Sequence, residues 1–359
     1  MDFGLSEEQT LLQSSVNRFL ANKVSLDKVR QFTKKGDANN GIWSGLCDMG
    51  LGGILIPEEL DGVGLSGMDA CIVAECLGFH TTPCSYLSTS VMAPLALLAA
   101  QKREDLLAAI ATGQHQFGVA FSDAIGNRAG SSLKWDGKLL NGSTLFVLDC
   151  DADTYLVATR EKHLLIVPSN AKGLEKKSIP NIDKTRPLGA LSFDHTPADL
   201  LSEDPAVFHE VLDAGRIMLA ADTLGAAQNM LDQAVLYAGQ REQFNRVIAS
   251  FQAVKHMCAE MLASLEPSRA MVWYAGHTIS DAKSEVRLTA CHTKAHLSEV
   301  GQFVAKTSTE VHGGMGFTDL VGLHYWFKRI GYNRQMLGGP ELLREEAAMI
   351  QGFVKNARI

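Results

Sequence analysis

The sequence predicts an α+β protein that is mainly α-helical, with an N-terminal helical domain, a small central antiparallel β domain and a C-terminal four-helix bundle. Three observations lead to this prediction. Helical periodicity dominates residues 1–114, short apolar runs divided by turn residues fill residues 115–203, and helical periodicity returns over residues 204–359. The chain has 359 residues, more than the ~250–300 that one hydrophobic core usually serves, so more than one domain is expected.

The first block opens with a helix-start signal. Ser6 is followed three residues later by Gln9, which is the spacing of a capping box. Apolar residues then recur at helical spacing, and residues 70–78 and 93–111 are further helical stretches rich in Ala and Leu. Residues 51–64 are rich in Gly and Pro, so they are expected to form a loop.

The central block carries strand signals. Its short apolar runs are residues 117–121, 139–140, 145–148, 155–158 and 164–167. The turn-forming pairs that divide them are Asp136-Gly137, Asn141-Gly142, Ser169-Asn170 and Lys172-Gly173. Short strands separated by such turns are typical of a small antiparallel barrel or sandwich.

The last block carries four apolar stripes at helical spacing. They run through residues 224–235, 251–261, 288–304 and 342–353. Each stripe gives a helix one face to bury, so the block is expected to form a bundle of four long helices.

Composition excludes several functional classes. Apolar residues make up 46% and charged residues 20%, so the chain is expected to fold, and the net charge of −7 disfavours a nucleic-acid partner. The longest apolar run, residues 91–100, is too short to span a membrane. The N-terminus lacks the basic region of a secretory signal. Seven cysteines without a C-x-x-C pair indicate a reducing compartment, so a cytoplasmic location is expected.

Several well-known site motifs are missing from the sequence. It contains no G-x-G-x-x-G between a strand and a helix, no Walker A motif, no G-x-S-x-G and no H-E-x-x-H. His292 and His296 stand four residues apart on a helical stretch, but no third ligand is in view. No metal site is therefore predicted.

Two segments carry more information than the rest. In the first, Arg241 and Phe244 interrupt two long helices, and the pair Phe251-Gln252 opens the second helix. A cation, aromatic faces and an amide grouped in this way suit a phosphate and a heteroaromatic ring. The second segment, residues 310–317, contains a Gly-rich break after a helix. It is interpreted either as a plain helix C-cap or as a place where the backbone approaches a ligand closely.

With these two segments, the order of the blocks resembles the acyl-CoA dehydrogenase family, and the resemblance covers nearly the whole chain. Further matches are the motifs Phe3-x-Leu5-x-Glu7-x-Gln9, Trp43-x-x-Leu46-x-x-Met49-Gly50, Ile56-Pro57-Glu58-Glu59-x-x-Gly62 and Ala74-Glu75-x-Leu77-Gly78. The resemblance implies an oligomer that binds FAD and desaturates an acyl-CoA between its α and β carbons. It also implies an electron-transfer flavoprotein as the electron acceptor. In this chemistry a carboxylate removes the α-proton, and FAD accepts the β-hydride.

The sequence departs from the family at the catalytic base. Most members carry a Glu shortly after the His-Gly-Gly motif, and the matching position is Leu337. Some relatives carry the Glu just before an Arg in the first bundle helix, and that position is Gly215, followed by Arg216. The family segments that lie against the flavin ring match residues 121–123 and 145–148, where Ser122 alone offers a hydroxyl.

The residues that are retained form a particular subset. In the family dimer, the matching residues hold the adenine and pyrophosphate of the neighbouring subunit's FAD. They are Arg241, Phe244, Phe251, Gln252, Glu310, Gly313 and Gly314, with Glu310 in place of the usual Gln. The resemblance therefore favours the subunit without a base in a heteromeric α2β2 enzyme, in which a second subunit carries the catalytic Glu. Residues 149–157, 83–86 and 338–344 resemble the steroid-degrading members of this kind.

Two alternatives remain open at this point. The first is a homomeric enzyme with an unorthodox base, for which Glu341 and Asp319 are the nearest carboxylates in the sequence. The second is a non-catalytic binding or scaffold protein on the same fold. The acyl group of the substrate cannot be read from the sequence, although a bulky, steroid-derived group is compatible with it.

Overall fold

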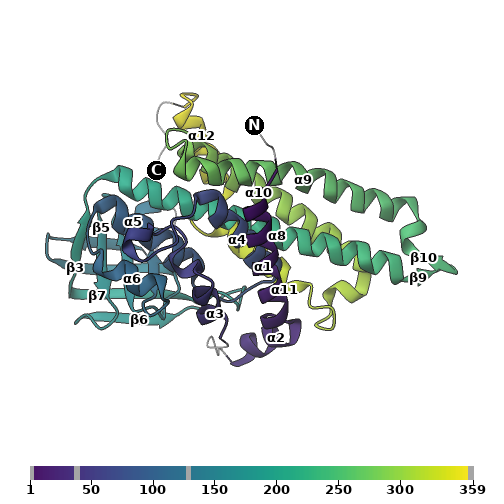
Figure 1. Ribbon diagram of the computed structural model, residues 1–359, viewed down its shortest axis with the longest axis horizontal. Coiled ribbons are helices and arrows are strands. Elements are labelled where there is room, and N and C mark those ends of the chain that lie inside the picture. The colour runs from purple at the N-terminus through teal and green to yellow at the C-terminus, as the bar shows by residue number, and fades with distance from the viewer. Residues whose placement is uncertain (1–3, 36–40, 127–130, 355–359) are drawn as a thin grey trace.

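The computed structural model describes residues 4–35, 41–126 and 131–354, and Figure 1 shows the path of the chain. Phe3, which begins the first family motif, lies outside the described residues. The mainly helical architecture with a central β-sheet region confirms the predicted fold class. Within the described residues, no helix is both long enough and apolar enough to cross a lipid bilayer.

The N-terminal part is helical. Its elements are α1 (Glu7–Lys23), α2 (Leu26–Lys35), α3 (Ile42–Asp48), α4 (Gly67–Phe79), η3 (Tyr86–Met92), α5 (Ala93–Ala100) and α6 (Asp105–Ala111). The predicted capping box is confirmed, because the Ser6 hydroxyl accepts from Gln9 N–H and the Gln9 side chain accepts from Ser6 N–H. The expected helix over 93–111 is divided in two, because Gln101 and Arg103 adopt left-handed conformations. The expected loop over 51–64 contains two short 3-10 turns, η1 (Leu51–Gly53) and η2 (Glu58–Leu60).

The central part is one twisted sheet, seen at the left of Figure 1. Its strands are β1 (Phe117–Ala120), β2 (Ser132–Trp135), β3 (Leu139–Leu148), β4 (Thr154–Ala158), β5 (Leu164–Pro168), β6 (Leu174–Ser178), β7 (Leu188–Pro197) and β8 (Asp199–Ser202), with the short helix α7 (Ser122–Ile125) after β1. The order is β6-β7-β3-β1-β4-β5-β8, and β2 pairs with β3. The pairs are antiparallel except β1 with β4, which is parallel.

One expected turn is wrong. Asn141-Gly142 lies inside β3, which runs without a break from Leu139 to Leu148. Both edges of β3 are paired at this point, with Gly142 opposite Leu133 on β2 and Phe193 on β7. Gly142 has φ +112°, and a Cβ there would lie 2.0 Å from the Ser132 carbonyl oxygen. The glycine therefore serves a strand irregularity and a close backbone approach rather than a hairpin.

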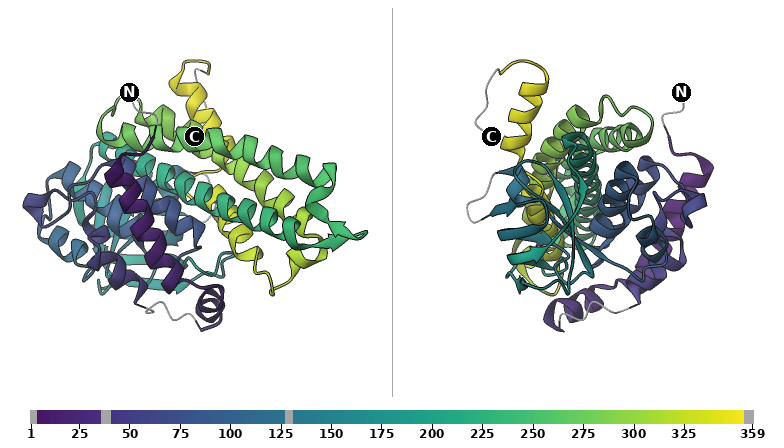
Figure 2. Two further views of the ribbon diagram at one scale, coloured as in Figure 1. Left: turned by 45° about the vertical axis from the view of Figure 1, so that its right-hand side comes forward. Right: turned by 90° about the vertical axis from the view of Figure 1, so that its left-hand side faces the viewer.

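The described residues of the C-terminal part, 204–354, form three long helices and two shorter ones. They are α8 (Pro205–Gln240), α9 (Gln252–Ser280), α10 (Val286–His312), α11 (His324–Gln335) and α12 (Pro340–Ile350). The expected fourth long helix is therefore α12, with 11 residues, preceded by the unexpected α11. Figure 2 shows the N-terminal helices and the yellow C-terminal end of the chain on opposite sides of the long helices.

Two glycines bring the N-terminal part and the bundle into backbone contact. A Cβ on Gly78 of α4 would lie 1.9 Å from the Asp222 carbonyl oxygen of α8, and one on Gly225 would lie 1.8 Å from the Glu75 carbonyl oxygen. Side chains at these positions would force the helices apart. The close α4–α8 contact therefore depends on both glycines.

A buried ionic cluster lies where the three parts meet. The fully buried guanidinium of Arg329 on α11 donates to Asp183 (2.5 Å) and to Asp222 (3.0 Å), and also to the Thr82 carbonyl (3.1 Å). Arg186 donates to the same Asp222 carboxylate at 2.6 Å. Burial would raise the pKa of Asp222, but Arg329 and Arg186 outweigh burial and hold it below its usual value. The cluster thus joins α8, α11, the β domain and the N-terminal part.

Arg329→Met is expected to destabilise the protein by about 3–5 kcal/mol, because it leaves Asp183 and Asp222 buried with too little compensating charge. The measurement is urea unfolding at neutral pH. The matched control is Arg344→Met, because the Arg344 side chain is 56% exposed and lies 3.7 Å from Glu299. The control should change the free energy of unfolding by less than about 1 kcal/mol. Equal effects of the two substitutions would contradict a stabilising role for the cluster.

Candidate functional site

The first predicted segment folds as a β-hairpin between α8 and α9. Strands β9 (Glu242–Gln243) and β10 (Arg246–Val247) pair antiparallel. Phe244 and Asn245 form the two-residue turn, and both have positive φ, of 55° and 60°. Positive φ at both central positions is the geometry that suits tight hairpins, and Asn tolerates it. The hairpin projects at the right-hand end of the molecule in Figure 1, far from the β domain.

The structure gathers four predicted site residues around this hairpin. Arg241 and Gln252 flank it, and both are exposed, while the Phe244 side chain is 88% exposed. The rings of Phe244 and Phe251 lie edge to face with centroids 6.1 Å apart. The Arg241 side chain makes no ion pair with any described residue. An uncompensated cation beside exposed aromatic rings can bind a phosphate and a heteroaromatic ring.

Sequence reasoning missed Arg246. Its guanidinium carbon lies 4.0 Å from the centre of the Phe251 ring, a cation–π contact that orders the ring at the hairpin base. The sequence signal for Arg246 was its place as a second cation, two residues after Phe244. Arg246 lies on β10, opposite Gln243 of β9.

The second predicted segment lies beside the first. The ring of His312, the last residue of α10, stacks on Tyr237 near the end of α8, with centroids 4.6 Å apart. Gly313 and Gly314 follow directly and are exposed, and Glu310 is exposed one turn earlier. The contact between Tyr237 and His312 therefore brings the two predicted segments to the same end of the molecule.

Gly313 caps α10, since its N–H donates to the Glu310 carbonyl and its φ is +57°. Of the two interpretations of this segment, the helix C-cap therefore holds for Gly313. A Cβ on Gly313 or Gly314 would meet no described atom within 4 Å. Space above these backbone groups is open, so a ligand has access to them.

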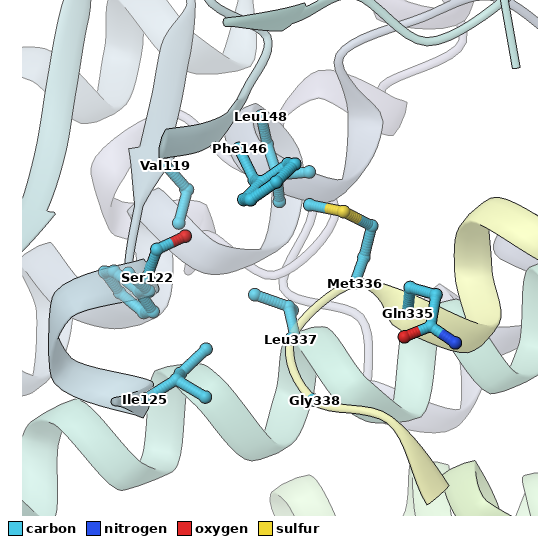
Figure 3. Close-up of a pocket in the computed structure, with 10 residues that line it drawn as sticks. Val119, Ser122, Ile125, Phe146, Leu148, Gln335, Met336, Leu337 and Gly338 are labelled. Atoms are coloured by element: carbon cyan, nitrogen blue, oxygen red, sulfur yellow. The ribbon is translucent and has the colours of Figure 1, made fainter. Parts of the chain in front are cut away.

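A second group of predicted residues meets between the β domain and the loop that joins α11 to α12, as Figure 3 shows. Ser122, Phe146 and Leu148 of the β domain face Met336 and Leu337 of the loop between α11 and α12. The cavity among them measures only about 20 Å³. The Ser122 hydroxyl donates to the Leu145 carbonyl at 2.6 Å, so it is already engaged within the β domain.

The two positions singled out for a base, Leu337 and Gly215, lie side by side in space. A Cβ on Gly215 of α8 would lie 2.8 Å from Leu337 Cδ1 and 2.8 Å from Met92 Sδ. These two residues are 122 positions apart in sequence, yet side chains at both positions would reach the same location. Two alternative positions for one catalytic base would require this. The groups found there are a hydrocarbon side chain and a thioether.

The other predicted carboxylates lie elsewhere. Among the described residues, none of those lining the cavity at Leu337 carries a carboxylate. Glu341 is 75% exposed and pairs with Arg334 at 3.3 Å. Asp319 is 60% exposed and lies 3.3 Å from Arg30. His292 and His296 are both exposed on α10, and the His296 ring contacts the Ser268 hydroxyl at 3.1 Å.

Two buried cations hold the loop that carries Leu337. Arg216 Nε donates to the Leu337 carbonyl at 3.0 Å. Lys294 Nζ donates to the Asn333 carbonyl at 2.6 Å and lies 3.4 Å from the Gly338 carbonyl oxygen. Burial lowers the pKa of Lys294 to about 7, and the charge of Arg216 adds to this lowering. Sequence reasoning missed Lys294, although a lysine within an apolar helix face was a possible signal.

Comparisons with known proteins agree with this architecture. Models for the N-terminal and C-terminal domains of acyl-CoA dehydrogenases match residues 6–114 and 206–351. The chain is 30% identical over 341 residues to acyl-CoA dehydrogenase IpdE2 of Mycobacterium tuberculosis, covering 94% of this chain and 96% of that protein.

Solved structures give the same result. The Tcur3481-Tcur3483 steroid ACAD G363A variant is 26% identical with a TM-score of 0.87, covering 97% of this chain and 99% of that one. The ChsE4-ChsE5 complex of Mycobacterium tuberculosis shares the fold, with 22% identity, a TM-score of 0.88, and 99% and 100% of the two chains covered. The chain therefore belongs to the acyl-CoA dehydrogenase family of FAD-dependent oxidoreductases that act on CH–CH groups of acyl-CoA thioesters.

Proposed function

We propose that this chain is the subunit without a catalytic base in a heteromeric, α2β2 acyl-CoA dehydrogenase. The observation that carries the proposal is the contact between Gly215 and the side chain of Leu337, which lines a cavity of about 20 Å³. Removal of an α-proton needs a positioned base. Neither residue supplies one, and no carboxylate of a described residue lines the cavity.

The cavity also does not fit a flavin ring. One buried water needs about 10–15 Å³ of such space, so about 20 Å³ holds a single water and no tricyclic ring. Leu337, Phe146 and Ile125 point into the place where the family's reaction would occur. The pocket at Leu337 of this chain therefore carries out no step of the reaction.

The hairpin end fits the other half of the cofactor. Arg241 carries a charge without a partner among the described residues, Phe244 offers an exposed ring, and the backbone at Gly313 and Gly314 is open. These groups suit the pyrophosphate and adenine of an FAD whose ring lies in a partner subunit. Glu310, when ionised, accepts hydrogen bonds from ribose or adenine but repels phosphate. FAD supplies the hydride-accepting chemistry when it is bound.

Relatives suggest the substrate and the partners. The Tcur3481-Tcur3483 variant is named as a steroid ACAD, and its name joins two designations. By this likeness, the complex acts on a bulky, steroid-derived acyl-CoA, and the second subunit carries the catalytic Glu. An electron-transfer flavoprotein accepts the electrons, and the complex works in the cytoplasm. The three domains are residues 1–114, 115–203 and 204–359.

The chain purified alone is expected to contain little FAD, because its own ring pocket is closed and the hairpin offers only half of a site. The measurement is the visible flavin spectrum and the flavin-to-protein ratio after gel filtration. Co-expression with the partner subunit should restore bound flavin. One flavin per lone chain would contradict the proposal.

Leu337→Glu is expected to leave the lone chain inactive and to destabilise it, because Leu337 is buried and the new carboxylate would lose its hydration there. Burial should raise the folded-state pKa of this Glu above its unfolded value of about 4.3. The loss of stability should therefore be full at neutral pH and shrink as the pH falls through the folded-state pKa. The control Leu337→Gln has the same shape without the charge, so its effect should not change with pH. Acyl-CoA oxidation by lone Leu337→Glu would contradict the closed pocket.

Arg241→Ala should lower the FAD affinity of the co-expressed complex by about tenfold to hundredfold, the effect of losing a charged hydrogen bond of about 1.5–3 kcal/mol. Thermal stability of the lone chain should stay the same, because Arg241 is exposed and packs against no core. The control is Arg18→Ala, an exposed cation on α1. Full flavin occupancy in Arg241→Ala would remove the support for a shared FAD site.

A further inference from the structure

Lys294 differs from the other buried cations, because no carboxylate of a described residue pairs with it. The Arg216 guanidinium has both Asp213 and Glu346 as partners. Lys294 is only 2% exposed, and its Nζ atom donates to carbonyl oxygens alone. A buried ammonium group without a counter-charge is costly, so only the dipoles around it compensate for the charge of Lys294.

These dipoles belong to the end of α11 and to the loop that follows it. Nζ lies 2.6 Å from the Asn333 carbonyl oxygen and 3.4 Å from those of Arg334 and Gly338. Because α11 ends at Gln335, the first two carbonyls lie in its last turn, where carbonyl groups lack partners within the helix. The helix dipole places partial negative charge there, and that charge attracts a cation. The three N–H donors of an ammonium group match the three carbonyls, whereas a neutral amine has two donors and no charge.

The loop depends on these outside contacts, because its backbone is strained. Leu337 has φ +56° and Gly338 has φ +107°, and positive φ is unfavourable for a branched side chain. Lys294 contacts the backbone on both sides of Leu337, at Asn333 and at Gly338. Loss of the contact with Gly338 would let this backbone relax. The side chains of Met336 and Leu337 would then move in the pocket that they line (Figure 3).

The charge of Lys294 changes close to neutral pH. Burial, followed by the charges of Arg216 and Arg334, lowers its pKa to about 7. Both forms of the side chain are therefore populated near neutral pH, and a change of one pH unit alters their ratio about tenfold.

The charged and titratable groups around Lys294 come from the helices packed against it. They are Asp213 and Arg216 of α8, Cys291, His296 and Glu299 of α10, Arg334 of α11, and Glu341 and Glu346 of α12. From α9, the contact near this level is the Ser268 hydroxyl, which is neutral.

The carboxylates in this set already pair with arginines. Asp213 and Glu346 pair with Arg216, and the other two pair with Arg334. Burial raises the pKa of Cys291 to about 12 and lowers that of His296, so both are neutral near pH 7. Burial also raises the pKa of Asp213 to about 6, which makes Asp213 the group to separate from Lys294 by experiment.

We infer that Lys294 is a pH-sensitive switch for this loop: the protonated side chain holds residues 336–339 in place, and loss of the proton releases them together with Leu337. Release changes the space at Leu337 but supplies no catalytic base. The inference therefore goes beyond the proposed function without altering it.

The first test follows the Met336 side chain by NMR in the full-length chain, labelled with ¹³C-methyl methionine. Its signal is assigned by its loss in Met336→Leu. In the wild type the signal should change with pH, with a midpoint at about pH 7. Lys294→Leu never carries the charge, so its signal should stay near the high-pH position. Lys294→Arg keeps the charge throughout, so its signal should stay near the low-pH position.

Two controls separate Lys294 from its neighbours. Lys306→Leu changes an exposed lysine on the same helix and should titrate as the wild type does. Asp213→Asn removes the neighbouring carboxyl group and should leave the midpoint near that of the wild type. A Met336 signal that is fixed in the wild type, that still titrates in Lys294→Leu, or that stops titrating in Asp213→Asn would overturn the inference.

Urea unfolding supplies a second measurement, which does not depend on the NMR signal. Because the folded-state pKa of Lys294 lies below its unfolded value of about 10.4, the unfolded chain binds more protons between these two values. Stability of the wild type relative to Lys294→Leu should therefore rise with pH above about 7, by up to about tenfold in the unfolding constant per pH unit. A difference that does not change with pH would show that Lys294 does not titrate in the folded chain, which also overturns the switch.

These measurements need neither flavin nor a partner subunit. A negative result would overturn the switch and leave the proposed function as it stands. One flavin bound per lone chain would contradict the proposed function, and the pH response of Met336 would still decide the switch.

Discussion

The buried guanidinium of Arg329 is the constraint on which the arrangement of the three parts depends. Its hydrogen bonds reach Asp183 in the β domain, Asp222 on α8 and the backbone at Thr82. A charge without solvent is tolerated only while such partners remain in place. Since α11 leads directly into residues 336–339, the cluster also fixes where the loop that carries Leu337 begins.

Two further buried cations act on that loop through neutral carbonyl groups. Arg216 holds the Leu337 carbonyl, and Lys294 holds the carbonyls on either side of it. Leu337 has φ +56°, an unfavourable conformation for a branched side chain. Such backbone strain persists only where the surroundings over-determine it, as the two cations do here. The strained backbone directs the Leu337 side chain into the pocket, which explains why so little space is left (Figure 3).

The two predicted site regions therefore have opposite character in this chain. At the β-domain end, side chains fill the pocket and are held by buried contacts. At the hairpin end, Arg241 and Phe244 are exposed, and they contribute little to the core of their own chain. Under the proposed function, these exposed residues serve a neighbouring subunit. Because the two regions are separated in space, a substitution in one is expected to leave the other unchanged.

The sequence by itself determined the fold class, and it predicted two ligand-binding segments and singled out Leu337 and Gly215. These follow from local signals, such as the Ser6–Gln9 capping box, helical periodicity and short motifs, which act over a few residues. Only the tertiary structure decided that Asn141-Gly142 continues a strand, because strand partners on both sides override the turn preference of the pair. It alone also placed Lys294 against the loop that carries Leu337 and joined Arg329 to Asp183 across 146 positions. Burial, cavity volume and charge pairing depend on residues far apart in the chain, and no local pattern encodes their distances.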